Sequence, residues 1–503
     1  MKKRLLLKNS CLLAGALLCL FLIGGEVPAA PLEVKIRIVS ASPPRARVEG
    51  RRAEGATAWS LRNFYGSAAG LAERVENLSL ADDGGAGVPA RKLAPGEFLA
   101  ERAATRFSYD FRLDPPAFIN DAAHVSWLAG EHGVLMLADL LPLPLSAAKV
   151  SLALPAGWGV STLEPGGDRS EYDVRDAERA VFVIGRDLRV KRRSAGRTGL
   201  NFTAAGEWAF GDDEAADSAV EILKTYAETM GGTPRGGVML ALLPWPQPIA
   251  ANLWSAEARG GTVVLVSGRL PSKLAATAQL NAALAHELFH LWVPNGLALD
   301  SDYDWFYEGF ANYQSLRAGL RLGHLTFQDY LAAIGRAFDI YKSARGAKEI
   351  TLAEASQRRW SGGSRLVYSK GMLVAALYDL NLMLRTGGRR SIDEVFRELF
   401  ERHREGRERE DGNAAVVRLL GGVSGMEEFT ARFVRGAEPI DLAQSINAFG
   451  LVVEPGGVRT HLGVAKTLER PQRELLRKLG YNENLEAEAR KAREQLKGRR
   501  PPE

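Results

Sequence analysis

The spacing of apolar residues along the chain predicts strands first and helices later. From Leu32 to about Asn201, short apolar or alternating runs are separated by Gly, Pro and Asp, a pattern typical of β-strands joined by turns. Together these runs predict an N-terminal β-sandwich-like domain over residues 30–205. The runs that we expect to form strands are Val34–Val39, Thr105–Leu113, His124–Leu128, Val134–Leu137, Val150–Leu154 and Ala180–Ile184.

The pattern changes near Asp212, where apolar residues begin to recur at helical spacing. We expect a helix over residues 214–230, then two apolar strands, then a long helix over residues 274–292. This order of elements predicts an α+β domain that spans residues 206–345. The two expected strands are Val238–Leu243 and Thr262–Val266.

Almost every later segment has helical spacing, and the segments beyond residue 345 predict a helical domain over residues 346–465. The basic tail, residues 466–503, is rich in Lys, Arg and Glu, a composition that fits either a surface helix or partial disorder. The expected helices are Tyr303–Ala318, Phe327–Ile340, Gly371–Leu384, Ile392–Glu401 and Met426–Val434.

The N-terminus has the composition of a targeting segment. A basic start, Lys2-Lys3-Arg4, precedes an apolar run from Leu12 to Ile23 that is too short for an ordinary membrane-spanning helix. Small residues in Val27-Pro28-Ala29 fit a cleavage site. We therefore predict a signal peptide over residues 1–29 and export to the periplasm or the cell exterior. If the segment stays uncleaved, residues 12–25 would instead anchor the protein in a membrane.

Two histidines and a glutamate occupy the end of the long helix expected over residues 274–292, in the sequence His286-Glu-Leu-Phe-His290. Residues four apart lie on the same face of a helix, so both imidazoles can approach one point, with Glu287 one position round from them. This is the H-E-x-x-H motif, in which the histidines bind zinc and the glutamate acts as general base. The sequence therefore predicts one Zn²⁺ per chain.

The third zinc ligand is expected to be a carboxylate, because both cysteines, Cys11 and Cys19, lie in the targeting segment. Glu308 follows a turn-rich loop and lies on the next expected helix, a position from which it can return to the histidines. Asn312 lies one turn beyond Glu308 on the same face. It is either a group that orients a ligand histidine or an ordinary amide on the helix surface. The remaining histidines fit no ligand spacing, and we expect them to be structural or solvated: His124, His132, His324, His403 and His461.

The residues around Glu308, W-x-x-E-G-F-A-x-Y, resemble the second-helix motif of the gluzincin peptidases, the group of aminopeptidase N and leukotriene A4 hydrolase. Downstream, the segment from Tyr368 to Val374 resembles the Y-x-K-G-x-L-V segment of the bacterial glycyl-aminopeptidase family, whose members usually carry a PDZ domain. The resemblance implies a thermolysin-like α+β zinc peptidase domain between the β domain and the helical region. It also implies that Tyr368 hydrogen-bonds the tetrahedral intermediate, a role that suits a phenol donor. The alternative is a packing tyrosine.

The chain departs from that family in three respects. Where the family has Gly-Leu-Glu-His to bind the amino terminus of the substrate, this chain has Trp254-Ser-Ala-Glu257-Ala258. Glu257 is the candidate to take the place of that glutamate, but the glycine and the histidine are missing. The loop between His290 and Glu308 is shorter than in the PDZ-bearing branch. We also expect no complete PDZ domain, because too few residues follow His461-Leu-Gly-Val464, which resembles the opening strand of that domain.

These features predict a zinc-dependent peptidase, and the resemblance favours an aminopeptidase. Two alternatives stay open: an endopeptidase of the same fold, and a catalytically silent scaffold that binds peptides. The expected partner is a peptide or protein substrate. Nucleic acid is not expected as a partner, because the net charge of +5 lies largely in the basic leader and the basic tail and leaves the body nearly neutral. The sequence does not indicate the oligomeric state or the residue preferred at the cleavage site.

Overall fold

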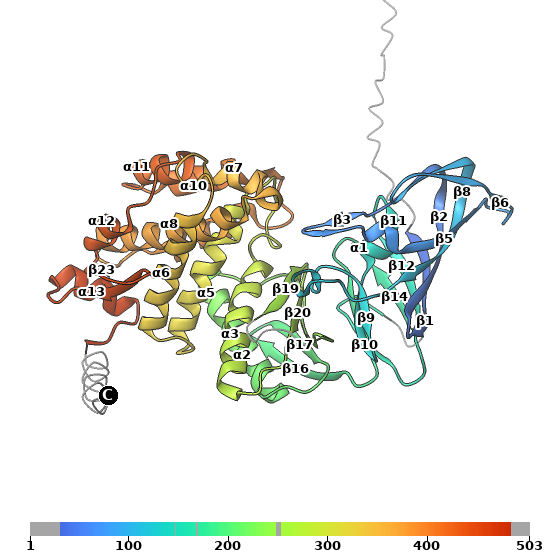
Figure 1. The fold of residues 1–503 in the computed structure, drawn as a ribbon, viewed down its shortest axis with the longest axis horizontal. Coiled ribbons are helices and arrows are strands. Elements are labelled where there is room, and N and C mark those ends of the chain that lie inside the picture. Colours follow the sequence, from blue (N-terminus) through green and yellow to red (C-terminus); the bar gives the residue numbers. More distant parts are fainter. Residues whose placement is uncertain (1–30, 146, 167–169, 248–252, 484–503) are drawn as a thin grey trace, which may run out of the picture.

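The computed structural model describes residues 31–145, 147–166, 170–247 and 253–483. The predicted signal peptide and most of the predicted tail lie outside these residues. Within them, no helix combines the length and the apolar character needed to cross a membrane. Figure 1 shows β-sheets at one end of the molecule and helices at the other.

The N-terminal part contains two sheets that pack face to face. The larger has nine strands, with the order β14-β12-β1-β2-β8-β5-β6, and with β11 beside β2 and β7 beside β8. Its strands are β1 (Leu32–Ala41), β2 (Pro44–Leu61), β5 (Val75–Ala81), β6 (Gly87–Val88), β7 (Ala90–Ala94), β8 (Glu97–Arg112), β11 (Pro142–Leu143), β12 (Ala148–Ala153) and β14 (Glu171–Val174). In β1, Val34, Ile36 and Ile38 are buried while their neighbours are exposed, so alternation directs one face of this sheet to the core.

The smaller N-terminal sheet has four strands in the order β13-β15-β10-β9. They are β9 (Trp127–Ala129), β10 (His132–Met136), β13 (Gly159–Ser161) and β15 (Val181–Gly185). Every residue of β15 is buried, as its continuous apolar sequence predicts for a strand covered on both faces. Phe182 and Ile184 pack toward the nine-stranded sheet, whereas Val181 and Val183 pack toward a third sheet, which has five strands.

The third sheet has five strands in the order β16-β17-β18-β20-β19. We call it the catalytic sheet because it belongs to the predicted zinc peptidase domain. They are β16 (Arg189–Ala195), β17 (Thr198–Ala204), β18 (Val238–Pro244), β19 (Trp254–Arg259) and β20 (Thr262–Ser267). On β18, Leu240 and Leu242 face the helices, while Met239 and Ala241 face the four-stranded sheet. The N-terminal β region and the catalytic sheet therefore share a packed interface.

Helices cover the other face of the catalytic sheet and fill the rest of the molecule. Helices α2 and α3 lie against the sheet, and α5, α6 and α8 continue the same hydrophobic core (Figure 1). The helices are α1 (Leu137–Leu140), α2 (Asp212–Met230), α3 (Lys273–Glu287), α4 (Asp304–Tyr307), α5 (Gly309–Arg321), α6 (Phe327–Ser343), α7 (Leu352–Gln357), α8 (Ser364–Arg385), α9 (Ile392–His403), α10 (Gly412–Gly422), α11 (Glu427–Thr430), α12 (Leu442–Asn447) and α13 (Arg470–Lys478).

Short elements connect these layers. They are the hairpin strands β3 (Phe64–Tyr65) and β4 (Ala68–Ala69), the paired strands β21 (Leu299–Asp300) and β22 (Glu410–Asp411), and the paired strands β23 (Leu451–Glu454) and β24 (His461–Val464). Single turns of tighter or wider helix occur at Leu71–Arg74, Ile119–Asp121, Phe289–Leu291, Arg359–Ser361 and Ala431–Arg435.

The predicted fold class, an α+β multidomain protein with an N-terminal β-sandwich-like part and a C-terminal helical region, is confirmed. Three details differ from the expectation. β17 pairs in parallel with β18, so residues 189–204 belong to the catalytic sheet and not to the N-terminal domain. One core runs from the sheet through the C-terminal helices, so the expected division at residue 345 does not separate two cores. Leu475 and Leu476 of α13 are buried, which makes the start of the expected tail part of the folded body.

Candidate active site

Helix α3 presents the first two candidate ligands and the candidate base. It begins at an N-cap, where the Ser272 hydroxyl accepts a hydrogen bond from the amide of Ala275 at 3.4 Å, and it ends at Glu287, earlier than predicted. His290 lies in the following single turn, and its ring centroid is 4.8 Å from that of His286. Because the helix ends here, the carbonyl of Val293 is available to accept the Nδ1–H of His290 at 2.9 Å. This bond leaves His290 Nε2 as the ligand atom.

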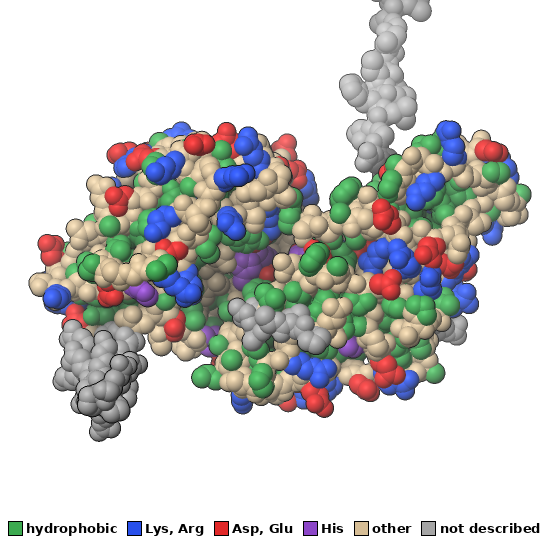
Figure 2. Space-filling model, in the orientation of Figure 1, with side chains coloured by type: hydrophobic (Ala, Val, Ile, Leu, Met, Phe, Trp, Pro, Cys, Tyr) green, Lys and Arg blue, Asp and Glu red, His purple; other side chains and the backbone are tan. Residues whose placement is uncertain are grey.

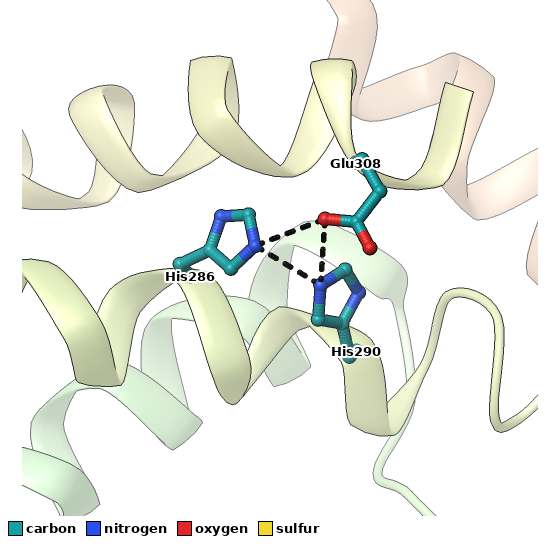
Figure 3. A group of neighbouring side chains, drawn as sticks. All are labelled: His286, His290 and Glu308. Carbon is teal, nitrogen blue, oxygen red and sulfur yellow. Dashed lines mark hydrogen bonds and ion pairs between the residues drawn. The ribbon is translucent and has the colours of Figure 1, made fainter. Parts of the chain in front are cut away.

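Glu308 supplies the third donor from the junction between α4 and α5. Its Oε2 atom lies 3.3 Å from Nε2 of His286 and 3.7 Å from Nε2 of His290, and the two Nε2 atoms are 3.2 Å apart. Figure 3 shows the three side chains converging from two facing helical segments. The structure thus brings together the three residues that the sequence predicts as metal ligands.

A pair of glycines allows the helix that carries Tyr368 to approach Glu308. A Cβ added to Gly309 would lie 2.7 Å from Cα of Gly371, and one added to Gly371 would lie 2.5 Å from the carbonyl oxygen of Trp305. The backbones of α5 and α8 therefore touch at the glycine of the E-G-F-A segment and the glycine of the Y-x-K-G segment. Each motif pairs a site residue with the glycine that permits this contact.

The proton on Tyr368 is strongly held. Burial and the negative charge of Glu308 raise the pKa of Tyr368 well above its usual value, although the guanidinium of Arg359 opposes this shift. The phenol therefore stays protonated and can donate a hydrogen bond to a developing oxyanion. Arg359 Nη2 donates to Tyr368 Oη at 2.8 Å and to Glu308 Oε1 at 3.0 Å.

The two site carboxylates differ in how firmly they hold a proton. Burial raises the pKa of Glu287, and the charges of Glu308 and Glu257 add to the effect although the two histidines oppose it. A raised pKa suits a group that must accept and return a proton near neutral pH. Burial would also raise the pKa of Glu308, but hydrogen bonds from the histidines and the charge of Arg359 hold it well below the usual value.

Glu257 lies on the edge strand β19, in a cluster with residues of the N-terminal β region. Tyr65 Oη donates to Glu257 Oε1 at 2.8 Å, and His124 Nδ1 lies 2.7 Å from Glu257 Oε2. The Arg259 guanidinium stacks over the Tyr65 ring, with its central carbon 4.2 Å from the ring centroid. Burial opposes the shift, but the bond to His124 keeps the pKa of Glu257 below its usual value, while Glu257 raises the pKa of His124 in turn. Glu257 is therefore ionised at neutral pH, and its charge favours the protonated form of His124.

The β3–β4 hairpin connects this cluster to the helical part. The hairpin carries Tyr65 and Gly66, and a Cβ added to Gly66 would lie 3.3 Å from the Trp360 ring. Trp360 follows Arg359, whose guanidinium lies 4.5 Å from the Trp360 ring centroid. Figure 2 shows histidine side chains in a hollow between the helical part and the β-sheet part of the surface. The hairpin bridges these two parts beside the candidate ligands.

The structure distinguishes the two interpretations left open for Asn312. Within the described residues, the Asn312 side chain donates no hydrogen bond to either ligand histidine, and the Val293 carbonyl orients His290 instead. His124 is not among the metal donors and pairs with Glu257, a structural contact that the sequence did not specify. Sequence reasoning also missed Arg359 and Tyr65, because neither belongs to a motif and their contacts join distant segments.

The three donors fit a zinc ion. They are two imidazole nitrogens and one carboxylate oxygen, all within 4.8 Å of one another, and each belongs to a side chain with little exposed surface. Two histidines and a carboxylate form a catalytic type of zinc site, in which three protein ligands leave one position open. Glu287 has no place among these donors, as expected for a base.

The fold and the donors together are those of a zinc metallopeptidase. Residues 279–374 match the family model of the M61 glycyl aminopeptidases, a segment that holds the three donors, Glu287 and Tyr368. The predicted resemblance to gluzincin peptidases is confirmed at this level. Comparison with the curated proteins gave no match.

Solved structures share the fold. An aminopeptidase N family protein from Idiomarina loihiensis superposes with a TM-score of 0.73 at 16% identity, covering 84% of this chain and 79% of that one. An M1 zinc metallopeptidase from Deinococcus radiodurans gives a TM-score of 0.52 at 14% identity, covering 82% and 96%. A mutant of that enzyme bound to a Tyr-Ser-Ala substrate gives the same TM-score and identity, with 82% and 95% covered. At these identities the likeness establishes the architecture.

Proposed function

We propose that this protein is an exported zinc-dependent aminopeptidase. The observation that carries the proposal is the position of Glu257, an ionised carboxylate on the edge strand whose charge acts on the pKa of Glu287. A carboxylate close enough to act on the pKa of the base can bind the ammonium group of a peptide and so place the first peptide bond at the base. Export rests on the targeting segment predicted at residues 1–29.

The hairpin supports the same assignment. Tyr65 contacts Glu257, and Gly66 packs on Trp360, so the β3–β4 hairpin bridges the edge strand and the helical part at the Glu257 end of the site. A substrate chain that continued past Glu257 would have to pass the hairpin. A site that is bounded at this end favours substrates that terminate there, namely peptides with a free amino terminus.

The residues divide the chemistry among them. His286, His290 and Glu308 would hold zinc, which when bound supplies a Lewis acid and lowers the pKa of water. Glu287, buried and with a raised pKa, accepts the proton of the attacking water and returns it to the leaving amine. Tyr368 keeps its own proton and donates a hydrogen bond to the oxyanion.

One observation favours an endopeptidase as the second candidate. Both oxygens of Glu257 already have partners, Tyr65 on one and His124 on the other. If these contacts hold during binding, Glu257 is a structural anchor for the N-terminal sheets. The amino terminus of the substrate then has no dedicated partner, and internal bonds of a longer chain become possible substrates.

Paired substrates separate the two candidates. The tripeptide Tyr-Ser-Ala and its N-acetyl form would be incubated with the purified protein, together with a panel of aminoacyl anilides and their N-acetyl forms. We expect release of the first residue from free-amine substrates alone, one zinc per chain, and loss of turnover with zinc retained in Glu287→Gln. Glu257→Gln should weaken hydrolysis of free-amine substrates by about tenfold or more, the scale of a lost charged contact. Cleavage of acetylated substrates that Glu257→Gln leaves unchanged would establish the endopeptidase instead.

A further inference from the structure

Arg359 has no place in the motif that identifies the site, yet it contacts two of the site residues directly. It lies in the single turn Arg359–Ser361 that precedes α8, and its side chain is 12% exposed. One terminal nitrogen, Nη2, donates both to Glu308 Oε1 and to Tyr368 Oη. An NH₂ group has two hydrogens, so a single nitrogen can hold both acceptors at once.

The first of these bonds assigns different tasks to the two oxygens of Glu308. Oε2 faces the histidine nitrogens at 3.3 and 3.7 Å, whereas Oε1 accepts the bond from Arg359 at 3.0 Å. A carboxylate that is free to rotate can present either oxygen, or both, to a metal. Arg359 fixes the rotation so that one oxygen points to the donor cluster.

The second bond directs the Tyr368 proton. Because Arg359 donates to the phenol oxygen at 2.8 Å, that oxygen acts as an acceptor toward the guanidinium. Its own O–H must therefore point away from the guanidinium, where Glu308 is also within hydrogen-bonding reach. Arg359 also stacks near the Tyr368 ring, 5.5 Å from the ring centroid, which limits movement of the ring. The phenol is oriented before substrate arrives, and such preorganisation is what makes an oxyanion donor effective.

A second pair of residues holds Arg359 in place. Arg359 Nη1 donates to Asp304 Oδ1 and, at 3.3 Å, to the hydroxyl of Tyr307, which itself donates to Asp304 Oδ1 at 2.6 Å. The Asp304 carboxylate balances the buried guanidinium charge. The fork of Arg359 is thus anchored at Nη1 and acts through Nη2, an arrangement that lysine cannot reproduce with its single nitrogen.

We propose that Arg359 is a positioning residue that sets the metal-facing oxygen of Glu308 and the proton of Tyr368 at the same time. Its loss should then affect two separate measurements, metal affinity and the rate of the chemical step. A merely structural arginine would change protein stability alone.

The metal measurement uses zinc and a competing chromophoric chelator on the full-length protein. Arg359→Met should weaken zinc binding by about 10- to 100-fold, the usual effect of removing a group that orients a ligand. Arg359→Lys keeps the charge beside Asp304 and should weaken it less. Arg358→Met, a loss of the same charge at an exposed neighbour, should leave zinc affinity unchanged. Unchanged affinity in Arg359→Met would overturn the role toward Glu308.

The turnover measurement is made at saturating zinc with the best free-amine substrate. We expect kcat to fall by about 10- to 100-fold in Arg359→Met and Arg359→Lys, with KM nearly unchanged. If Arg359 acts through Tyr368, adding Arg359→Lys to Tyr368→Phe should reduce kcat less than adding it to the wild type. Full kcat at saturating zinc, or additive losses in the double variant, would overturn the role toward Tyr368. Only this measurement depends on the peptidase function proposed above. Should Arg359→Met not fold, Arg359→Lys serves for both measurements.

Discussion

The imidazole of His124 lies 2.7 Å from the carboxylate of Glu257 and joins the N-terminal β region to the edge strand of the catalytic sheet. Both side chains are about one-fifth exposed, at 20% and 22%. His124→Gln would remove the cation and leave Glu257 with Tyr65 and Arg259 as neighbours. We expect the free energy of unfolding to fall by about 1–3 kcal/mol, less than for a fully buried pair.

The pH dependence of this loss distinguishes an ion pair from packing. The pKa of His124 in the folded protein is raised above its ordinary value of 6.5. Burial lowers it, but the hydrogen bond to Glu257 and the negative charges of Glu257 and Glu287 together outweigh burial. The stability that the pair contributes is therefore complete below pH 6.5 and is lost as the pH rises through the folded pKa. Urea unfolding at several pH values should show a gap between wild type and His124→Gln that narrows at high pH. His461→Gln, at an exposed strand residue, is the control. A gap that does not change with pH would contradict the ionic account.

The contact between Gly309 and Gly371 predicts that one added methyl group will push Tyr368 away from Glu308. Gly309→Ala places a Cβ 2.7 Å from a backbone atom of α8, which cannot move aside as a flexible side chain can. Overpacking of this kind costs about 1–3 kcal/mol, more than the gain of about 1 kcal/mol in helix propensity. We also expect kcat to fall, because Tyr368 moves away from Glu308.

Thermal unfolding and steady-state kinetics of Gly309→Ala check both effects. The matched control is Gly422→Ala, a helical glycine whose added Cβ would meet nothing within 4 Å. The control should be neutral or slightly stabilising. Equal behaviour of the two variants would show that the backbones of α5 and α8 do not touch.

Removal of zinc should leave the protein folded. The would-be ligands have internal partners: His290 bonds to the carbonyl of Val293, and Glu308 bonds to Arg359. Zinc that binds only the folded state stabilises it by about 4 kcal/mol when free zinc exceeds the dissociation constant a thousandfold. Thermal unfolding with EDTA, and then with added zinc, should show a lower midpoint that zinc restores. His286→Gln should abolish the restoration while keeping the fold. Unfolding by EDTA alone would show that the metal is structural.

The sequence predicts the donors well because their positions follow from local geometry. His286 and His290 are four residues apart on a helical turn, and Glu308 follows a loop of the right length, so no long-range contact is needed to recognise them. The sequence places the end of α3 wrongly, because apolar residues continue at helical spacing through Leu291 although the helix stops at Glu287. The boundary at residue 205 is also wrong, because the parallel pairing of β17 with β18 reaches across the whole of α2.

Contacts between distant segments explain the residues that the sequence could not show. Tyr65 reaches Glu257 only because the four-stranded sheet docks on the catalytic sheet, and nothing in the local pattern around Tyr65 encodes that docking. Arg359 lies in a short turn without periodicity and meets Glu308 only after α8 has packed on α5. In both cases the missing information is the tertiary packing.

Lys370, in the same Y-x-K-G segment as Tyr368, allows a prediction about stability. It lies two positions after Tyr368 on α8, its side chain is completely buried, and its Nζ has no hydrogen-bond partner among the described residues. Burial lowers the pKa of Lys370 to about 8, from an ordinary value of 10.5. Between these two values the unfolded chain binds a proton that the folded protein does not. Stability should therefore rise with pH across this window, by at most about 3 kcal/mol.

Lys370→Met tests this account, because methionine fills a similar volume without a charge. At pH 7 we expect the variant to be more stable than the wild type by about 1–3 kcal/mol, since an unpaired buried ammonium no longer opposes folding. The difference should shrink as the pH rises from about 8 to 10.5. In this window Lys370 of the folded wild type has lost its proton, whereas Lys370 of the unfolded chain still binds one. Urea unfolding at three pH values measures it, with the exposed Lys348→Met as control. A variant that is less stable at pH 7, with an unchanged pH profile, would mean that Lys370 carries its charge at no cost, and the lowered pKa would then be wrong.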